Sequence, residues 1–257
     1  MPCALRGLRV LVTRPAAQAE AFCRLLRAAG ARPVPFPVLA IEPLPPAVAP
    51  PLPARLDWVI FVSANAVRHG LPWLRRQAAF PTARVAAIGR QTAARLDEAS
   101  QPVHLVAPPP HTSEALLAQP ALAEVTGRTV LIVRGEGGRT LLADTLATRG
   151  ARVHHLIAYR RTRPAVAPDA LARLLAEPGV DVAAVTSVEA LHNLLAMAGK
   201  LARAELLARP LLVGSARMAE AARQLGFRHP PLQAASPADR AMLDALCQWA
   251  QEQENPS

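Results

Sequence analysis

Short apolar runs alternate with amphipathic stretches along most of the chain. Buried parallel strands produce such runs, and apolar residues at helical spacing indicate helices that cover them. The pattern predicts strands at 8–13, 32–36, 58–62, 84–88, 103–106, 129–133, 152–157, 181–185 and 210–213. It predicts helices at 16–29, 64–76, 90–98, 139–148, 168–177, 188–198, 215–225 and 237–251, and a further helix capped by Ser113. This alternation indicates an α/β fold with parallel sheets covered on both faces.

The same pattern occurs twice in the chain. Residues 7–14, GLRVLVTR, resemble residues 127–134, GRTVLIVR. Residues 57–67, DWVIFVSANAV, resemble residues 181–191, DVAAVTSVEAL. Two related α/β domains in one chain suggest a ligand held between them.

A proline-rich passage interrupts the alternation after the second strand. It cannot form regular helix or central strand, and therefore indicates a linker at Pro43, Pro45, Pro46, Pro50, Pro51 and Pro53. Segment 57–155 supplies five strands alone, whereas the first strand–helix–strand unit needs later strands to complete its sheet. We therefore predict a discontinuous domain at 1–36 and 164–257, an inserted domain at 44–156, and paired hinge linkers at 37–43 and 157–163. Two domains in sequence are the alternative.

Composition indicates the class of protein, its compartment and its oligomeric state. The chain has 257 residues, of which 51% are hydrophobic, and it shows neither a signal peptide nor a membrane-spanning stretch. Its three cysteines are far apart and odd in number, which favours a reduced cytoplasmic protein over a disulfide framework. The chain lacks a second apolar stripe that would suit an interface, so we expect a monomer.

The formal net charge is +10, and almost all of the positive charge is arginine, with Lys200 as the one lysine. This charge reflects either a GC-rich genome or a polyanionic partner. Aromatic residues make up only 4%, and no basic run is interleaved with them, which disfavours nucleic acid. If the charge reflects a polyanionic partner, a small polyanion is therefore a better candidate than nucleic acid.

Small and polar residues gather where predicted strands end and helices begin. In open α/β sheets, ligands bind at these junctions because helix N-termini present free N–H groups there. A carboxylate gains about 0.3–1 kcal/mol from the helix dipole, and hydrogen bonds to a charged group contribute about 1.5–3 kcal/mol each. Any one such residue could simply cap its helix. Their recurrence in both domains favours a polycarboxylate ligand, with candidates at Thr13, Arg14, Ser63, Ala64, Asn65, Gly89, Arg90, Thr92, Ser113, Arg139, Ser187, Val188 and Ser215.

The remaining motifs give weaker evidence of function. The run Gly135-Glu136-Gly137-Gly138 follows a strand, but Thr140 stands where a dinucleotide loop needs its third glycine. The seven histidines form no ligand pattern, since the adjacent His154 and His155 point to opposite faces of a strand, so we predict no metal. Tyr159, the one tyrosine, lies in the predicted hinge, where its phenol could donate a proton or merely pack.

Together these segments resemble the uroporphyrinogen-III synthase family. The resemblance covers most of the chain, and it rests on the order and spacing of loose motifs more than on any single one. They are VLVTRP at 10–15, FVSANAV at 61–67, VAAIGRQTAARL at 85–96, TSEALL at 112–117, VLIVRGEGGRTLLADTL at 130–146, AYRRTRP at 158–164 and VTSVEAL at 185–191.

The resemblance implies two flavodoxin-like domains with parallel sheets, one inserted in the other and joined by a two-strand hinge. It implies a cyclising lyase without metal or organic cofactor. Its substrate is hydroxymethylbilane, a linear tetrapyrrole with eight carboxylates, which loses water and closes with its last ring inverted. Tyr159 would assist departure of the water. Backbone N–H groups at Ser63-Ala64, Gly89-Arg90, Ser113 and Ser187-Val188 would anchor carboxylates, with bidentate contacts from Arg14 and Arg139.

One departure from the family pattern stands out. Many relatives carry Thr at the helix start where this chain has Ser215 and Arg217, which puts a hydroxyl role there in doubt. The competing interpretation of the whole chain is a non-catalytic, two-lobed cytoplasmic binder of a small polycarboxylate.

Overall fold

The computed structural model describes residues 5–45, 52–176 and 179–254. Contacts between residues divide the chain into two units. Unit 1 consists of Met1–Ala40 and Thr162–Ser257, and unit 2 of Ile41–Arg161. Pro46, Pro50 and Pro51 of the proline-rich passage lie outside the described residues. Each unit is an α/β structure built around one sheet, which confirms the predicted fold class.

Unit 1 contains a five-stranded sheet in the order β11-β10-β9-β1-β2, and every paired register in it is parallel. In chain order this arrangement is 2-1-3-4-5, the flavodoxin-like order. The elements are β1 (Arg9–Val12), α1 (Ala16–Ala28), β2 (Arg32–Pro35), α6 (Ala170–Leu175), β9 (Val182–Val185), α7 (Val188–Leu207), β10 (Leu211–Val213), α8 (Ala216–Gln224), β11 (Leu232–Gln233) and α9 (Asp239–Glu254).

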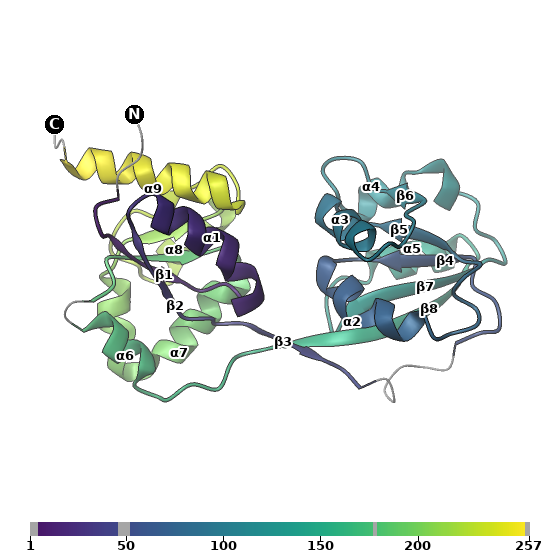
Figure 1. Cartoon of the computed structure of the whole chain (residues 1–257), viewed down its shortest axis with the longest axis horizontal. Helices are drawn as coiled ribbons and strands as arrows, with labels where there is room; N and C mark the ends of the chain where they lie inside the picture. Colours follow the sequence, from purple (N-terminus) through teal and green to yellow (C-terminus); the bar gives the residue numbers. More distant parts are fainter. Residues whose placement is uncertain (1–4, 46–51, 177–178, 255–257) are drawn as a thin grey trace. The chain divides into compact units, whose positions relative to one another are not determined.

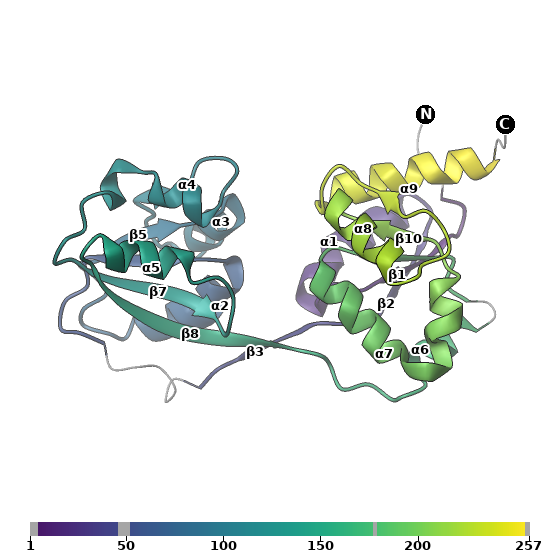
Figure 2. The same cartoon turned by 180° about the vertical axis from the view of Figure 1, so that it is seen from behind.

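Alternate residues of the central strands of unit 1 feed two separate cores. Val10 and Val12 of β1 pack with α1 and α9 on one face, whereas Leu11 packs with α6, α7 and α8 on the other. Figures 1 and 2 show these two layers from opposite sides. Strands buried on both faces explain why the sequence reads as uninterrupted apolar runs.

Unit 2 contains a six-stranded sheet in the order β3-β8-β7-β4-β5-β6. Its α2 and α3 share one core with Phe61, while α4 and α5 share the other with Ile60. Figure 1 shows α2 and α3 in front of this sheet, and Figure 2 shows α4 and α5. The elements are β3 (Ala40–Pro43), β4 (Trp58–Phe61), α2 (Ala64–Leu74), β5 (Arg84–Ala87), α3 (Arg90–Glu98), β6 (Leu105–Val106), α4 (Ser113–Leu117), η2 (Pro120–Leu122), β7 (Thr129–Gly135), α5 (Leu141–Thr148) and β8 (Arg152–Thr162).

The internal repeat in the sequence corresponds to equivalent strands in the two sheets. Strand β7 repeats β1, and β4 repeats β9, so β6-β5-β4-β7-β8 has the same spatial order as β11-β10-β9-β1-β2. The connections differ, because the first strand of unit 2 after the edge strand β3 is β4, the counterpart of β9, which comes third in unit 1. Read along its own chain, the sheet of unit 2 is therefore ordered 3-2-1-4-5 beside the edge strand β3.

The residues predicted as hinge linkers are largely strand. Strand β8 does not end at residue 157 but continues to Thr162, and β3 lies beside it at the edge of the sheet. The Leu44 amide donates to the Ala158 carbonyl at 3.1 Å, and Arg160 pairs with Glu42 at 2.9 Å. Pro43 fits here because an edge strand tolerates residues without an N–H donor.

Other differences from the sequence predictions are local. Helix α7 continues past residue 198 through a kink at Gly199, and α9 begins at Asp239, so Pro237 is not its first residue. The cysteines also differ from expectation, since Cys247 is disulfide-bonded while Cys23 is free and buried. Within the described residues, no helix is both long and apolar enough to cross a membrane.

Candidate active site

Tyr159 lies inside the core of unit 2 and is only 2% exposed. The pairing register between β7 and β8 shifts by one residue next to Tyr159: Arg134 pairs with Ile157, but Gly135 pairs with Tyr159. Ala158 is thus an extra residue in β8, as in a β-bulge. Neighbouring residues of a regular strand face opposite ways, yet Ala158 and Tyr159 both pack in the core beneath α2. The bulge therefore turns the tyrosine ring toward α2.

The phenol hydroxyl of Tyr159 lies beside the N-terminus of α2. Its hydroxyl lies 3.1 Å from Ser63 Oγ, and either oxygen can be the donor. Ser63 also caps α2, since its Oγ accepts from the Ala66 amide at 3.1 Å. When Tyr159 is the donor, Ser63 Oγ accepts two hydrogen bonds and keeps its own proton to donate elsewhere. Ser63 is half-buried and is thus the more accessible of the two hydroxyls.

Gly135 makes room for this pair. A Cβ atom at position 135 would lie 2.6 Å from Tyr159 Cζ, 2.7 Å from Cε2 and 3.1 Å from the phenol oxygen. Real Cβ atoms do not approach neighbours so closely, and Gly135 is therefore required for the ring to sit where it does. Beyond the bulge, the Glu136 amide donates to the Tyr159 carbonyl at 2.8 Å, so β7 and β8 remain hydrogen-bonded there.

His69 of α2 borders the same ring. Its imidazole centroid lies 6.0 Å from that of Tyr159, with the planes tilted by 44°. Burial, with a smaller effect of the Arg68 charge, lowers the pKa of His69 from its ordinary value. A neutral imidazole therefore accompanies the phenol at neutral pH.

A second junction of unit 2 lies at the start of α3. Gly89 is its N-cap in extended conformation, Arg90 is exposed, and Thr92 is buried. The first N–H groups of a helix have no acceptor within that helix, so the backbone here offers donors to an anion. The Thr92 side chain is only 3% exposed and belongs to the packing of the junction.

Two predictions about the following helices need correction or refinement. Ser113 does not cap α4; Thr112 does, with its Oγ1 accepting from the Ala115 amide at 3.3 Å. Thr112 has the extended backbone of an N-cap, and Ser113 is already helical. Arg139 precedes α5 and pairs with Glu114, whose pKa it holds below the ordinary value. Both side chains are more than half exposed, so this pair can open.

Unit 1 offers two capped helix starts. Ser187 Oγ accepts from the Ala190 amide at 3.0 Å and leaves the Val188 amide at the first turn of α7. Ser215 Oγ accepts from the Met218 amide at 3.4 Å at the start of α8. These serines act as caps, as most serines at helix starts do, and any ligand contact there falls to the backbone amides.

Thr13 and Arg14, both predicted to contact the substrate, make side-chain contacts within unit 1. Thr13 is fully buried, and its hydroxyl donates to the Ala184 carbonyl at 2.7 Å. The Arg14 guanidinium pairs with Asp239, donates to the Pro237 carbonyl at 2.7 Å and stacks over Phe22 at 5.0 Å. The Thr13 hydroxyl therefore already has its acceptor, whereas Arg14 is oriented by these contacts and keeps N–H donors that they do not use.

Comparisons with known proteins bear on the chemistry of these residues. The family model described as Uroporphyrinogen-III synthase HemD matches residues 20–244. This chain belongs to the uroporphyrinogen-III synthase family. The enzyme of Salmonella typhimurium is 36% identical over 248 residues, covering 93% of this chain and 98% of that protein. The enzyme of Escherichia coli is 34% identical over 250 residues, with the same coverage of both chains.

Solved structures agree with this assignment. A mutant uroporphyrinogen III synthase from Thermus thermophilus is 25% identical, covers 96% of this chain and 100% of its own, and gives a TM-score of 0.60. The synthetase from Helicobacter pylori gives 0.65 at 15% identity, covering 94% and 99%, and shows a shared fold. As a uroporphyrinogen-III synthase, the chain is a hydro-lyase of tetrapyrrole biosynthesis.

Sequence reasoning names Ser63 and Tyr159 separately but misses Gly135 as the residue that fits them together. The only signal in the sequence is the glycine run after β7, whose spacing raises a dinucleotide loop instead. Among the described residues of this uroporphyrinogen-III synthase, no group of three His, Cys, Asp or Glu side chains could hold a metal ion. His155 is instead a partly buried strand residue whose pKa burial lowers.

Proposed function

We propose that this chain converts hydroxymethylbilane into uroporphyrinogen III, and that Tyr159 and Ser63 supply the proton that leaves with water. The observation that supports this role is the 3.1 Å contact between the two hydroxyls at the carboxyl end of the sheet in unit 2. Loss of the hydroxymethyl oxygen leaves an azafulvene cation and requires a proton donor near that oxygen.

The buried position of Tyr159 defines how the proton would travel. The phenol is too enclosed to be the outermost donor, whereas Ser63 is half-buried at the start of α2. In the proposed arrangement Tyr159 donates to Ser63 Oγ, and Ser63 donates its own proton to the leaving oxygen. Ser63 then carries two accepted bonds and one donated bond, which matches the capacity of a hydroxyl. The electrons of the broken C–O bond leave with the water.

Backbone amides at helix starts would anchor the carboxylates of the substrate. The proposed anchors in unit 2 are the first turns of α2 at Ala64-Asn65 and of α3 at Gly89-Arg90, with Arg139 beside α5. Those in unit 1 are the first turns of α7 at Val188 and of α8 after Ser215. Each hydrogen bond that a backbone amide donates to a carboxylate contributes about 1.5–3 kcal/mol, so a few such sites suffice for tight binding.

Orientation of the reacting atoms would account for the ring inversion. Attack at the substituted carbon of the last ring, through a spiro intermediate, requires the bilane to be held in one fold. Holding reactants in the productive geometry contributes about 7–11 kcal/mol in favourable cases, more than general acid catalysis does. We therefore propose that the carboxylate-binding groups determine which isomer forms. The Ser63–Tyr159 pair would determine how fast water is lost.

The decisive experiment separates the isomers formed from hydroxymethylbilane. Unaided closure gives the type I isomer, so chromatography after oxidation resolves the enzymatic type III product from the blank. We expect predominantly type III product from the unaltered chain. We expect Tyr159→Phe to lower turnover about 10²-fold, at the low end of general acid catalysis. Thr148→Ala, which removes an exposed hydroxyl elsewhere in unit 2, should leave turnover unchanged.

Two results would count against this proposal. Type I product at the unaided rate would remove the synthase assignment for this chain. Type III product with undiminished turnover in Tyr159→Phe would leave the reaction standing and remove the phenol from it. Circular dichroism on the same samples shows whether each variant is folded.

We further propose that the chain acts as a monomer. In the described part of the chain, the large hydrophobic side chains that are exposed are Val106, Val166 and Leu201. They come from β6, from the segment after β8 and from α7, so they do not form one apolar stripe. Light scattering should give a mass near 27.3 kDa, and twice that mass would contradict the proposal.

A further inference from the structure

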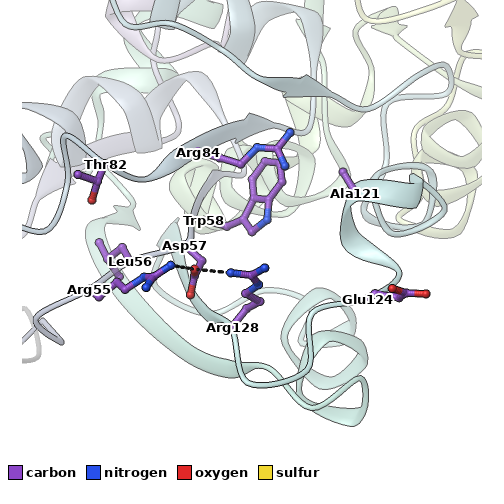
Figure 3. Close-up of a pocket in the computed structure, with 9 residues that line it drawn as sticks. All are labelled: Arg55, Leu56, Asp57, Trp58, Thr82, Arg84, Ala121, Glu124 and Arg128. Atoms are coloured by element: carbon purple, nitrogen blue, oxygen red, sulfur yellow. Dashed lines mark hydrogen bonds and ion pairs between the residues drawn. The ribbon is translucent and has the colours of Figure 1, made fainter.

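A cavity of about 580 Å³ lies at the amino ends of strands β4, β5 and β7 in unit 2. The proposed reaction site lies at the other end of these strands, since β4 begins at Trp58 and ends at Phe61, just before Ser63. Figure 3 shows the residues that line the cavity. They are Arg55, Leu56, Asp57, Trp58, Thr82, Arg84, Ala121, Glu124 and Arg128.

Three arginines from separate segments line this cavity, and two of them pair with Asp57. The Asp57 carboxylate lies 3.1 Å from Arg128 Nη1 and 3.3 Å from Arg55 Nη2. The carboxylate is itself fixed, because it accepts from the Thr129 amide at 2.8 Å. Figure 3 shows it between the two guanidinium groups. Asp57 therefore positions two cations and leaves most of their N–H donors unused.

Arg84 completes the cationic wall. Its guanidinium lies over the indole of Trp58, 4.4 Å from the ring centroid. Within the described residues, no carboxylate forms an ion pair with it. Stacking on an aromatic face orients a guanidinium and leaves its edge free for a bidentate partner.

The charges around the cavity favour an anion. Three guanidinium groups face two carboxylates, and one of these, Asp57, is already engaged by two of the guanidinium groups. Glu124 stands apart from the arginines in Figure 3. The helix starts that could bind an anion belong to the opposite end of the sheet, so the arginines are the cationic groups here. The cavity volume falls in the range that encloses a metabolite-sized ligand.

We propose that this cavity binds a small polyanion that carries phosphate or carboxylate groups. Arg84 and Arg128 clamp the anion in bidentate fashion, and Arg55 closes the third side. The site is separate from the proposed reaction site, so its occupant and the bilane bind without displacing each other.

Titration calorimetry with pyrophosphate and with citrate tests this site. We expect one ligand per chain for at least one of the two probes, and affinity that falls as salt is raised. Binding of pyrophosphate alone assigns phosphate chemistry, binding of citrate alone assigns carboxylate chemistry, and binding of both assigns general anion recognition. Arg84→Gln and Arg128→Gln should each weaken binding about tenfold or more, as loss of a charged hydrogen bond does. Arg95→Gln, which removes an exposed arginine of α3 outside the cavity, should not.

The fluorescence of Trp58 gives a local signal. An anion that engages Arg84 changes the environment of the indole, so emission should change on binding in the unaltered chain and stay constant in Trp58→Phe. The proposal would be overturned if neither pyrophosphate nor citrate bound at about 1 mM. Equal affinity in the Arg84→Gln, Arg128→Gln and Arg95→Gln variants would also overturn it. Synthase turnover, measured on the same samples, should be unchanged in Arg84→Gln. A loss of anion binding with full turnover therefore concerns this cavity alone and not the proposed reaction site.

Discussion

Gly135→Ala tests the placement of Tyr159 without removing any polar group. The added Cβ would lie 2.6 Å from Tyr159 Cζ, whereas carbon atoms in contact keep about 3.5–4.0 Å. The ring must therefore move by about 1 Å, or the strands must separate by that amount. Gly135 does not have a positive φ, so its backbone conformation accepts alanine and the clash is the only perturbation.

The substitution should have two separate effects, one on stability and one on turnover. Overpacking of this kind costs about 1–3 kcal/mol of unfolding free energy, which a urea titration detects. The contact between Tyr159 and Ser63 is 3.1 Å long and does not survive a displacement of about 1 Å. Misplacement of a reacting group by that amount costs about 10²-fold in rate, or about 2.7 kcal/mol of activation free energy, so turnover of hydroxymethylbilane should fall even among molecules that remain folded.

The double variant shows whether Gly135 acts through the phenol. If it does, Gly135→Ala should lower turnover in the unaltered chain but have little further effect when combined with Tyr159→Phe. Equal losses in both backgrounds would refute the reasoning, because the glycine would then act on something other than the hydroxyl. Full turnover in Gly135→Ala, with stability reduced, would show that the observed hydroxyl contact is not needed for the reaction.

Three further predictions concern stability. Thr112→Ala should lower the free energy of unfolding by about 1 kcal/mol through loss of the α4 cap, while Ser113→Ala should have little effect, as urea titration of the pair would show. Thr13→Val should cost about 1–3 kcal/mol in the same assay by leaving the Ala184 carbonyl unpaired, and turnover per folded molecule should stay constant. The Thr129 amide and Arg128 hold the pKa of Asp57 below its ordinary value, so its stabilising effect is present above the unfolded-state pKa and is lost as the pH falls through the folded-state pKa. Asp57→Asn should therefore be less stable at neutral pH and flatten the acid decline in urea midpoint.

The sequence is most informative where strands are buried on both faces. The runs that form β4, β5 and β7 are predicted to within a residue or two because each contains at least three consecutive apolar residues. Strand β11 has only two residues and no apolar run to mark it. The predicted end of helix α7 is too early, because its pattern resumes after the kink at Gly199 through Ala202 and Leu206.

The site is predictable as separate residues but not as an arrangement. Ser63 and Tyr159 are 96 positions apart, and the bulge at Ala158 that brings them together has no signature in the apolar pattern. Arg14 shows the same limit. Its position at a strand end suggests ligand binding, but its ion-pair partner Asp239 is 225 positions away and could not be predicted from the local sequence. Side-chain partners across the fold determine which polar residue at a junction remains available.

The insertion of unit 2 also fixes the order in which the protein can be assembled on the ribosome. Strand β1 pairs with β9 through Val10 and Val182, and β9 is synthesised only after the whole of unit 2. The first strand to be made thus waits with one unpaired edge while the later unit completes its own sheet, and such an edge is open to wrong partners. A nascent chain stopped near residue 165 should therefore contain a folded unit 2 and a protease-sensitive N-terminal segment.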